Sequence, residues 1–318
     1  MRGVFLDIHT VGKADLDLEP LLETLPDWEF PDNISPGNTA AAIQGAAVVV
    51  SNKARLDRDI LQQADKLRLI CVAATGTNNV DLATAADKNI TVCNVRAYAT
   101  ASVVEHVFLQ ILALNRRLQE YREAVRRGDW QNADSFCLLD YPIRELAGQT
   151  LGIIGYGELG KAVAHMGEAF GMQLLIAQRP NTPASPGRTP LNELLSKSDI
   201  VSLHCPLTST TRNLIDSTGF ALMRRDAILI NTARGGIVNE HALVQALRTG
   251  QIGAAAVDVL SEEPPRRGNP LLEPSVPNLL ITPHIAWAGV NARQRLVNEI
   301  AANIRAFLDG QPRNVVQA

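Results

Sequence analysis

Three side chains in the C-terminal half of the chain have the chemistry needed to reduce a keto acid. Arg234, Glu263 and His284 each come shortly after an apolar run. A guanidinium binds a carboxylate through paired hydrogen bonds, and an imidazole donates a proton near neutral pH. A carboxylate on the other imidazole nitrogen stabilises the protonated ring. The three residues therefore predict hydride transfer to a small 2-keto acid, although each taken singly also fits a surface Arg, a structural His or a solvated Glu.

A glycine-rich turn supplies a candidate source of the hydride. Gly155, Gly157 and Gly160 follow the apolar residues 151–154 and open a helical segment. In a strand, turn and helix of this kind, glycines permit the tight turn, the approach of a pyrophosphate to the backbone, and close helix packing. The positive end of the helix then faces the phosphates. We expect a dinucleotide here, the alternative being a purely structural turn.

The next strand bears on the choice of cofactor. An NAD site usually has Asp or Glu at the end of that strand to bind the ribose hydroxyls, whereas this chain has Gln178 and Arg179. Glutamine does not repel a 2′-phosphate, and a guanidinium can pair with one. The sequence thus allows NAD or NADP, with NADP plausible; Arg179 as a solvated surface residue is the open alternative.

Polar residues also follow the later apolar runs, where parallel strands would bring them to one edge of a sheet. The full set of predicted cofactor-binding residues is Gly155, Tyr156, Gly157, Glu158, Leu159, Gly160, Gln178, Arg179, His204, Cys205, Pro206, Thr211, Thr232, Ala233 and Asp258.

Short apolar, β-branched runs separated by helical segments must position these residues. The runs are 48–50, 69–72, 151–154, 174–176, 200–203, 228–230, 255–259 and 279–281, after a first strand within residues 1–7. Continuous apolar strands alternating with helices are typical of parallel sheets covered on both faces, so we predict an α/β fold. Residues 102–119 and 292–308 are expected to be helices, and the Pro-rich 181–188 a loop.

Composition excludes several other classes of function. The 318 residues are 46% hydrophobic and 20% charged, with net charge −3 and pI about 6.1, which favours neither nucleic acid nor an anionic membrane as a partner. We expect no secretory leader and no membrane span. Cys71, Cys93, Cys137 and Cys205 lack metal-ligand or disulfide spacing, so we expect reduced thiols, no metal and a cytoplasmic protein.

With these residues in place, the chain resembles the D-isomer-specific 2-hydroxyacid dehydrogenases, most closely the glycerate dehydrogenase and hydroxypyruvate reductase branch. The resemblance covers almost the whole chain. Its motifs are residues 72–81, 91–95, the glycine-rich turn, 204–208, 231–236, 258–264 and 283–284.

The resemblance implies two Rossmann-like domains with doubly wound parallel sheets and the active site between them. A substrate-binding domain of residues 1–99 and 286–318 would be discontinuous, with an NAD(P)-binding domain of residues 100–285 inserted into it. By resemblance, Arg234 binds the substrate, His284 is the general acid or base, and Glu263 is its partner. The homodimer typical of the family would form through residues 101–147, which carry Trp130, Phe136 and Tyr141.

The same resemblance suggests further substrate contacts. Backbone amides of Thr75, Gly76 and Thr77 would hold the carboxylate, and Lys53 stands where this branch has a lysine facing the substrate, a plain surface lysine being the alternative. Trp287 departs from the pattern after the catalytic His. It would narrow the pocket for short substrates such as hydroxypyruvate or glyoxylate, unless it is a packing residue.

Two other functions remain open from the sequence. One is a phosphoglycerate dehydrogenase, which would want a further basic group for the phosphate. A formate dehydrogenase is disfavoured, because it would carry Gln in place of Glu263. A non-catalytic NAD(H)-sensing protein would keep the glycine-rich turn without needing the Arg, Glu and His together. The residues cannot give the physiological substrate or direction.

Overall fold

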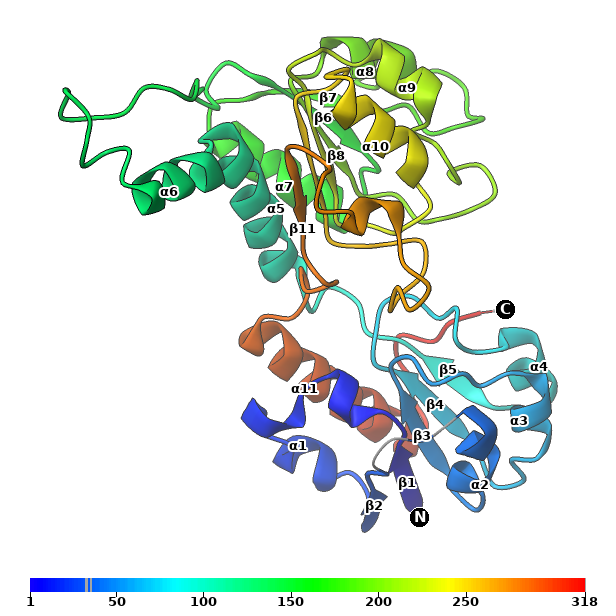
Figure 1. Ribbon diagram of the computed structural model, residues 1–318. Helices are drawn as coiled ribbons and strands as arrows, with labels where there is room; N and C mark the ends of the chain where they lie inside the picture. Colours follow the sequence, from blue (N-terminus) through cyan, green and yellow to red (C-terminus); the bar gives the residue numbers. More distant parts are fainter. Residues whose placement is uncertain (32–33, 35, 318) are drawn as a thin grey trace. The chain divides into compact units, whose positions relative to one another are not determined.

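The computed structural model describes residues 1–31, 34 and 36–317, which form two compact units (Figure 1). The first unit comprises Met1–Ala99 and Trp287–Ala318, and the second comprises Thr100–Ala286. Residues 32, 33, 35 and 318, all expected in the substrate-binding domain, lie outside the described residues. Ala286, also expected there, belongs to the second unit because its amide donates to Asp258 and its carbonyl accepts from Ser102.

The first unit is a five-stranded parallel sheet in the order β2-β1-β3-β4-β5. Helices α1 and α11 cover one face, while α2, α3 and α4 lie together on the other (Figure 1). Its elements are β1 (Arg2–Phe5), α1 (Glu19–Leu22), β2 (Asp27–Glu29), α2 (Thr39–Ile43), β3 (Val48–Ser51), α3 (Arg58–Gln62), β4 (Leu69–Val72), α4 (Leu82–Asp87), β5 (Thr91–Cys93) and α11 (Val290–Leu308), with short 3-10 helices at Ile8–Thr10, Lys13–Asp15 and Pro36–Asn38.

The second unit is a six-stranded parallel sheet in the order β11-β10-β9-β8-β6-β7. Helices α5 and α7 pack on one face and α8, α9 and α10 on the other (Figure 1). Its elements are α5 (Thr100–Asn115), α6 (Leu118–Arg127), β6 (Thr150–Ile154), α7 (Glu158–Ala169), β7 (Gln173–Ile176), α8 (Leu191–Lys197), β8 (Ile200–Leu203), α9 (Ser217–Leu222), β9 (Ile228–Asn231), α10 (Glu240–Arg248), β10 (Ala254–Val257) and β11 (Leu279–Ile281), with a 3-10 helix at Pro270–Leu272.

Both sheets follow from the continuous apolar runs. β3, β4, β8, β9 and β10 are buried along their whole length, as strands covered on both faces must be. The α/β prediction with doubly wound parallel sheets is confirmed. In each sheet, the strand order reverses direction between two neighbouring strands, which creates a topological switch point. These strands are β1 and β3 in the first unit and β6 and β8 in the second.

The predicted helix over residues 102–119 is wrong at its C-terminal end. The helix is interrupted between α5 and α6, where Arg117 adopts a left-handed backbone with φ 54°. Both segments keep helical apolar spacing, so the pattern alone does not reveal the break. No helix among residues 1–31, 34 and 36–317 is long and apolar enough to cross a membrane.

Candidate active site

The glycine-rich turn has the shape of a dinucleotide cradle. A Cβ on Gly155 would lie 2.5 Å from Cys205 N, and one on Gly160 would lie 1.9 Å from Gly155 O, so the turn, β8 and α7 close tightly only with glycine. At Gly157 a Cβ would meet no described atom within 4 Å, which leaves the backbone open to a ligand. Among the described residues no side chain caps the first turn of α7, so its amides suit a pyrophosphate.

The ends of β8 and β9 carry two buried polar atoms that have no hydrogen-bond partner among the described residues. These atoms are Nδ1 of His204 and Oγ1 of Thr232. The amide of His204 donates to Ile154 O at 2.7 Å, which places the segment after β8 beside the glycine-rich turn. Both residues were predicted to bind the cofactor, and a buried polar group without a protein partner is expected where a ligand supplies it. The site therefore fits a nicotinamide dinucleotide.

Burial lowers the pKa of His204 to about 4. Its Nε2 lies 2.8 Å from Ser202 Oγ, a neutral partner, so the ring is uncharged at neutral pH. Nearby, the Thr211 hydroxyl donates to Pro206 O at 2.6 Å and accepts from Thr208 N, so Thr211 shapes the loop containing Cys205 and Pro206.

The side chain of Gln178, after β7, is hydrogen-bonded to residues of the loop that follows it. Gln178 Nε2 donates to Thr182 Oγ1 at 2.7 Å, and Gln178 Oε1 accepts from Ser185 N at 3.3 Å. Arg179 is exposed at the start of this loop. Gln178 thus organises the segment between β7 and α8.

The loop after β9 presents Arg234. Asn231 accepts from Ala233 N at 3.1 Å and donates to Arg234 O at 3.1 Å, which fixes the turn from within. A Cβ on Gly235 would lie 1.9 Å from Leu260 O. This close approach brings the Arg234 loop against the segment after β10 that carries Glu263.

Glu263 and His284 form a hydrogen-bonded pair. His284 Nδ1 lies 2.6 Å from Glu263 Oε2, while Leu260 N donates to Glu263 Oε1 at 2.7 Å. Both side chains are partly exposed, at 27% for His284 and 33% for Glu263, so a small molecule can reach them. His284 adopts a left-handed backbone with φ 56°, which is uncommon for a non-glycine residue and requires the surrounding chain to hold it.

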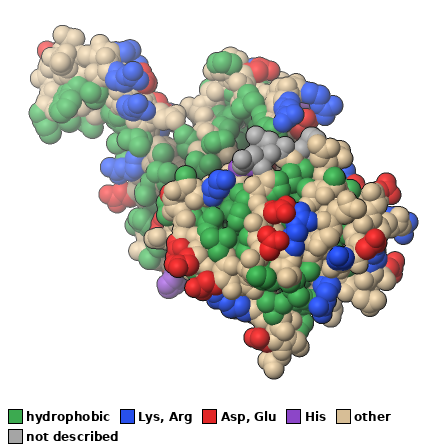
Figure 2. Space-filling model, turned by 90° about the horizontal axis from the view of Figure 1, so that it is seen from below, with side chains coloured by type: hydrophobic (Ala, Val, Ile, Leu, Met, Phe, Trp, Pro, Cys, Tyr) green, Lys and Arg blue, Asp and Glu red, His purple; other side chains and the backbone are tan. Residues whose placement is uncertain are grey.

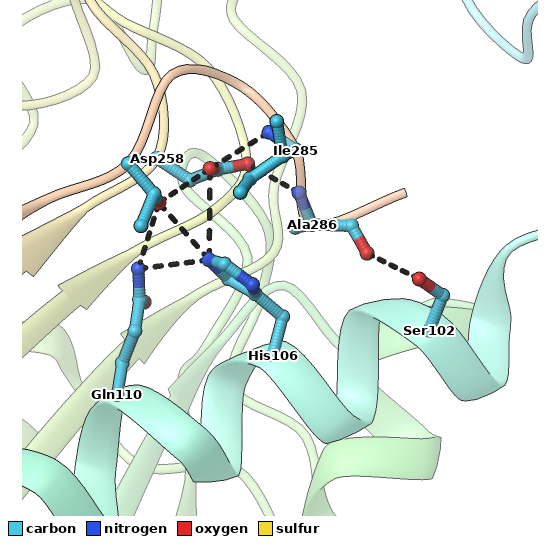
Figure 3. Close-up of polar contacts among 7 residues, drawn as sticks. Ser102, His106, Gln110, Asp258, Ile285 and Ala286 are labelled. Carbon is cyan, nitrogen blue, oxygen red and sulfur yellow. Dashed lines mark hydrogen bonds and ion pairs between the residues drawn. The ribbon is translucent and has the colours of Figure 1, made fainter. Parts of the chain in front are cut away.

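Asp258 provides that support. Its side chain is fully buried, and its carboxylate accepts from the Thr282 hydroxyl at 2.5 Å, Ile285 N at 2.9 Å and Ala286 N at 2.8 Å. Figure 3 shows the bonds from Asp258 to Ile285 and Ala286. Together with the Thr282 bond, they hold the turn on both sides of His284. Asp258 was predicted to bind the cofactor; its carboxylate is engaged by the turn that positions the candidate acid.

Two residues of α5 complete this network, and the sequence analysis missed both. His106 Nε2 lies 3.0 Å from Thr282 Oγ1 and 3.6 Å from Asp258 Oδ1, and Gln110 Nε2 donates to Thr282 Oγ1 at 3.2 Å (Figure 3). Burial lowers the pKa of His106, and the Asp258 carboxylate opposes this shift. In the sequence, the spacing of four positions between His106 and Gln110 indicated only that both lie on one face of a helix.

In the first unit, Lys53 follows the switch-point strand β3. The buried carboxylate of Asp7, two residues after β1, accepts from the amides of Asn52 at 2.8 Å, Lys53 at 2.6 Å and Ala54 at 2.7 Å. Asp7 therefore fixes the backbone of the Lys53 loop. The sequence analysis did not identify it.

The other candidate substrate residues of the first unit lie in two places. Thr75 donates to Val95 O at 2.9 Å, and Asn94 Nδ2 donates to Thr75 O at 2.7 Å, which holds the segment of Thr75, Gly76 and Thr77 beside the end of β5. Trp287 packs edge-on against Tyr98, with ring centroids 6.4 Å apart, at the margin of the core beneath α11.

Comparison with known proteins identifies the family. The sequence model for the NAD-binding domain of D-isomer specific 2-hydroxyacid dehydrogenases matches residues 108–286, more than half of the chain. The chain belongs to the D-isomer specific 2-hydroxyacid dehydrogenase family. It is thus an oxidoreductase that acts on a CH–OH group and uses a nicotinamide cofactor.

Relatives of this dehydrogenase match it along nearly its whole length. It is 45% identical to a glycerate dehydrogenase of Methylorubrum extorquens, covering 95% of this chain and 98% of the relative. A hydroxypyruvate reductase of Blautia hydrogenotrophica is 36% identical over 99% of both chains. The crystal structure of D-lactate dehydrogenase from Aquifex aeolicus, complexed with NAD and lactic acid, superposes with a TM-score of 0.80 at 29% identity, covering 97% of this chain and 96% of that one.

The dehydrogenase also carries an exposed arm, residues 116–147, with several large apolar side chains on its surface. Phe136 is 89% exposed, Leu139 84% and Trp130 53%. Trp130 Nε1 donates to Phe136 O at 2.9 Å, and Tyr121 packs edge-on against Tyr141, so the arm is ordered by its own contacts. An apolar hollow there is lined by Tyr121, Val125, Trp130, Phe136, Cys137 and Leu138. Hydrophobic side chains gather on the lobe at the left of Figure 2, where Figure 1 shows α6 and the arm.

Proposed function

We propose that this dehydrogenase interconverts a short 2-keto acid, hydroxypyruvate or glyoxylate, and its D-2-hydroxy acid. The observation that carries the proposal is the 2.6 Å contact between His284 and Glu263 beside the loop of Arg234. A proton donor with a carboxylate partner and a nearby guanidinium are what a keto acid needs when its carbonyl is reduced. The names of the glycerate dehydrogenase and hydroxypyruvate reductase relatives support the same substrate class.

In reduction, Arg234 binds the substrate carboxylate and polarises the carbonyl. A nicotinamide cofactor held by the glycine-rich turn would supply the hydride. His284 donates a proton to the carbonyl oxygen as negative charge develops there, and because Glu263 holds Nδ1, the transferred proton leaves from Nε2. Glu263 stabilises the protonated ring before transfer. In oxidation, His284 takes the hydroxyl proton as a base.

The enzyme is expected to use NADPH at least as efficiently as NADH. No carboxylate stands at the end of β7 to repel a 2′-phosphate, because the residue there is Gln178. Catalytic efficiencies with the two cofactors give the test. An NADPH to NADH ratio of one or more is expected, and a strong preference for NADH would contradict it.

We further propose that the first unit contributes Lys53 and the amides of Thr75, Gly76 and Thr77 to substrate binding, and that Trp287 limits substrate length. The contact of Trp287 with Tyr98 supports its alternative role in packing. Trp287→Ala tests the choice: acceptance of longer 2-keto acids supports the pocket role, and an unchanged substrate profile with lower stability supports packing.

The arm favours a homodimer, and the dispersed free cysteines favour a cytoplasmic enzyme. The net charge of −3 favours neither nucleic acid nor an anionic membrane as a partner. Neighbouring exposed side chains such as Trp130, Phe136 and Leu139 are typical of a protein–protein interface.

Absorbance at 340 nm tests the proposed reaction. NADH and NADPH are each offered with hydroxypyruvate, glyoxylate, pyruvate and phosphohydroxypyruvate. Turnover with hydroxypyruvate or glyoxylate is expected to exceed the others. The best turnover with phosphohydroxypyruvate would favour a phosphoglycerate dehydrogenase, and cofactor binding without turnover would favour an NAD(H) sensor.

A further inference from the structure

The segment around the end of β7 carries positive charge without a balancing acid. From residue 169 to residue 192 the sequence contains no Asp or Glu, yet it contains Arg179 and Arg188. Lys161, near the start of α7, adds a third cation. Within the part of the chain that the structure describes, no ion pair joins any of these three side chains to a carboxylate. Their charge is available to an anion.

Two of the cations converge on one aromatic ring. The guanidinium carbon of Arg188 lies 4.9 Å from the ring centroid of Tyr156, and the ammonium nitrogen of Lys161 lies 6.0 Å from it. Tyr156 stands between Gly155 and Gly157 in the glycine-rich turn. Both cations therefore contact an aromatic ring that belongs to the turn that fits a dinucleotide.

Contacts hold the side chain of Arg188, whereas the side chain of Arg179 is exposed. Gln178 N donates to Thr189 O at 2.7 Å and Thr189 N donates to Ile176 O at 2.8 Å, so the residue after Arg188 is bound to the end of β7. Arg188 is half-buried and its Nη1 lies 3.5 Å from Ala177 O, while Arg179 is exposed. A guanidinium held by stacking and by its backbone loses less entropy when it binds an anion.

We propose that Arg188, stacked on Tyr156 and assisted by Lys161, binds a phosphate monoester on the adenosine ribose of the cofactor and selects the phosphorylated dinucleotide. The inference rests on the proposed function, because it needs a dinucleotide in the glycine-rich turn. It differs from the sequence-based expectation, which placed phosphate recognition at Gln178 and Arg179. Gln178 is already hydrogen-bonded within its own loop, and the preorganised cation is Arg188. The nearest acid on α7, Glu158, is hydrogen-bonded by the Thr100 hydroxyl.

Calorimetric titration without substrate tests the assignment. The probes are NADPH, NADH, 2′,5′-ADP and 5′-AMP, and the proteins are the wild type, Arg188→Ala, Arg188→Lys, Arg179→Ala and Lys197→Ala. Lys197→Ala is the control for loss of one positive charge, since Lys197 lies on α8 and pairs with Glu193. Arg188→Ala is expected to weaken NADPH and 2′,5′-ADP binding by about ten- to a hundredfold, as for loss of a charged hydrogen bond.

The same variant should leave the Kd for NADH and 5′-AMP within about threefold, which also shows that the protein is folded, and Arg188→Lys should restore part of the loss. Equal weakening of all four probes, or a larger loss in Arg179→Ala than in Arg188→Ala, overturns the assignment. Equal wild-type affinity for NADPH and NADH overturns it while leaving the proposed dehydrogenase intact. Failure of both dinucleotides to bind overturns both proposals.

Discussion

Ala286 N donates to Asp258 Oδ2 across 2.8 Å, and this bond ties the far side of the His284 turn to the buried end of β10. The same carboxylate holds the near side through Thr282. His284 keeps its left-handed backbone only while the turn is held in this way. Asp258 is thus a positioning residue for the proposed acid.

Asp258→Asn should lower kcat by roughly tenfold or more, because an amide replaces one charged acceptor oxygen with a donor and leaves an amide of the turn unpaired. The free energy of unfolding should fall by about 2 kcal/mol for the same reason. Steady-state kinetics and urea unfolding give the two values. If kcat stays unchanged while the Kd of the cofactor rises, Asp258 is a cofactor ligand instead.

Glu263→Gln should lower kcat by roughly a hundredfold with a much smaller change in KM, since the neutral amide no longer stabilises the protonated imidazole of His284. His284→Ala should lower kcat further than Glu263→Gln does, while both variants keep the dinucleotide affinity of the wild type. Calorimetry and the 340 nm assay check these values. Wild-type turnover by His284→Ala would falsify the role of the acid.

His204 should remain neutral down to about pH 4. Because its folded-state pKa is lower than the 6.5 of an exposed imidazole, the unfolded chain binds the extra proton between these pH values. The free energy of unfolding should therefore fall as the pH drops from about 6.5 to about 4, with a slope that approaches about 1.4 kcal/mol per pH unit, and this contribution should level off below.

NMR titration of the His204 ring carbon measures this pKa directly. Burial lowers the pKa of His106 too, so its stability effect has the same sign, and His204→Gln separates the two contributions. A His204 ring that titrates near 6.5 would show that the imidazole is solvated rather than buried.

The exposed arm gives a prediction about assembly. Phe136→Asp should dissociate the proposed homodimer at micromolar concentration, because it places a charge in the apolar surface that the partner would cover. Leu272→Asp is the matched control, since Leu272 is also exposed, at 44%, but lies outside the arm. Analytical ultracentrifugation measures the mass. A monomeric wild type would contradict the interface.

The sequence predicted the sheets well because parallel strands are read from local composition. The apolar runs at 69–72, 200–203 and 279–281 coincide with β4, β8 and β11. β2 was not predicted: with the sequence Asp-Trp-Glu at the edge of its sheet, it has two exposed positions and no continuous apolar run.

The sequence suggested candidate site residues where one residue type carries the chemistry, as at Arg234, Glu263 and His284, and their catalytic roles stay a prediction. The site was not predictable where a side chain holds a distant backbone. Thr282 lies 176 positions from His106, and Lys53 lies 46 positions from Asp7. Such bonds depend on which strand ends become neighbours, and this information is absent from any local pattern.

Helix α11 has a consequence for how the protein is made. Leu296, Val297, Ile300 and Ile304 complete the core on one face of the first unit's sheet, yet they are synthesised after the entire second unit. On the ribosome, the second unit can fold while strands β1 to β5 still expose part of that apolar face. The N-terminal strands are therefore the first part of the chain to be synthesised and the last to have their apolar face covered.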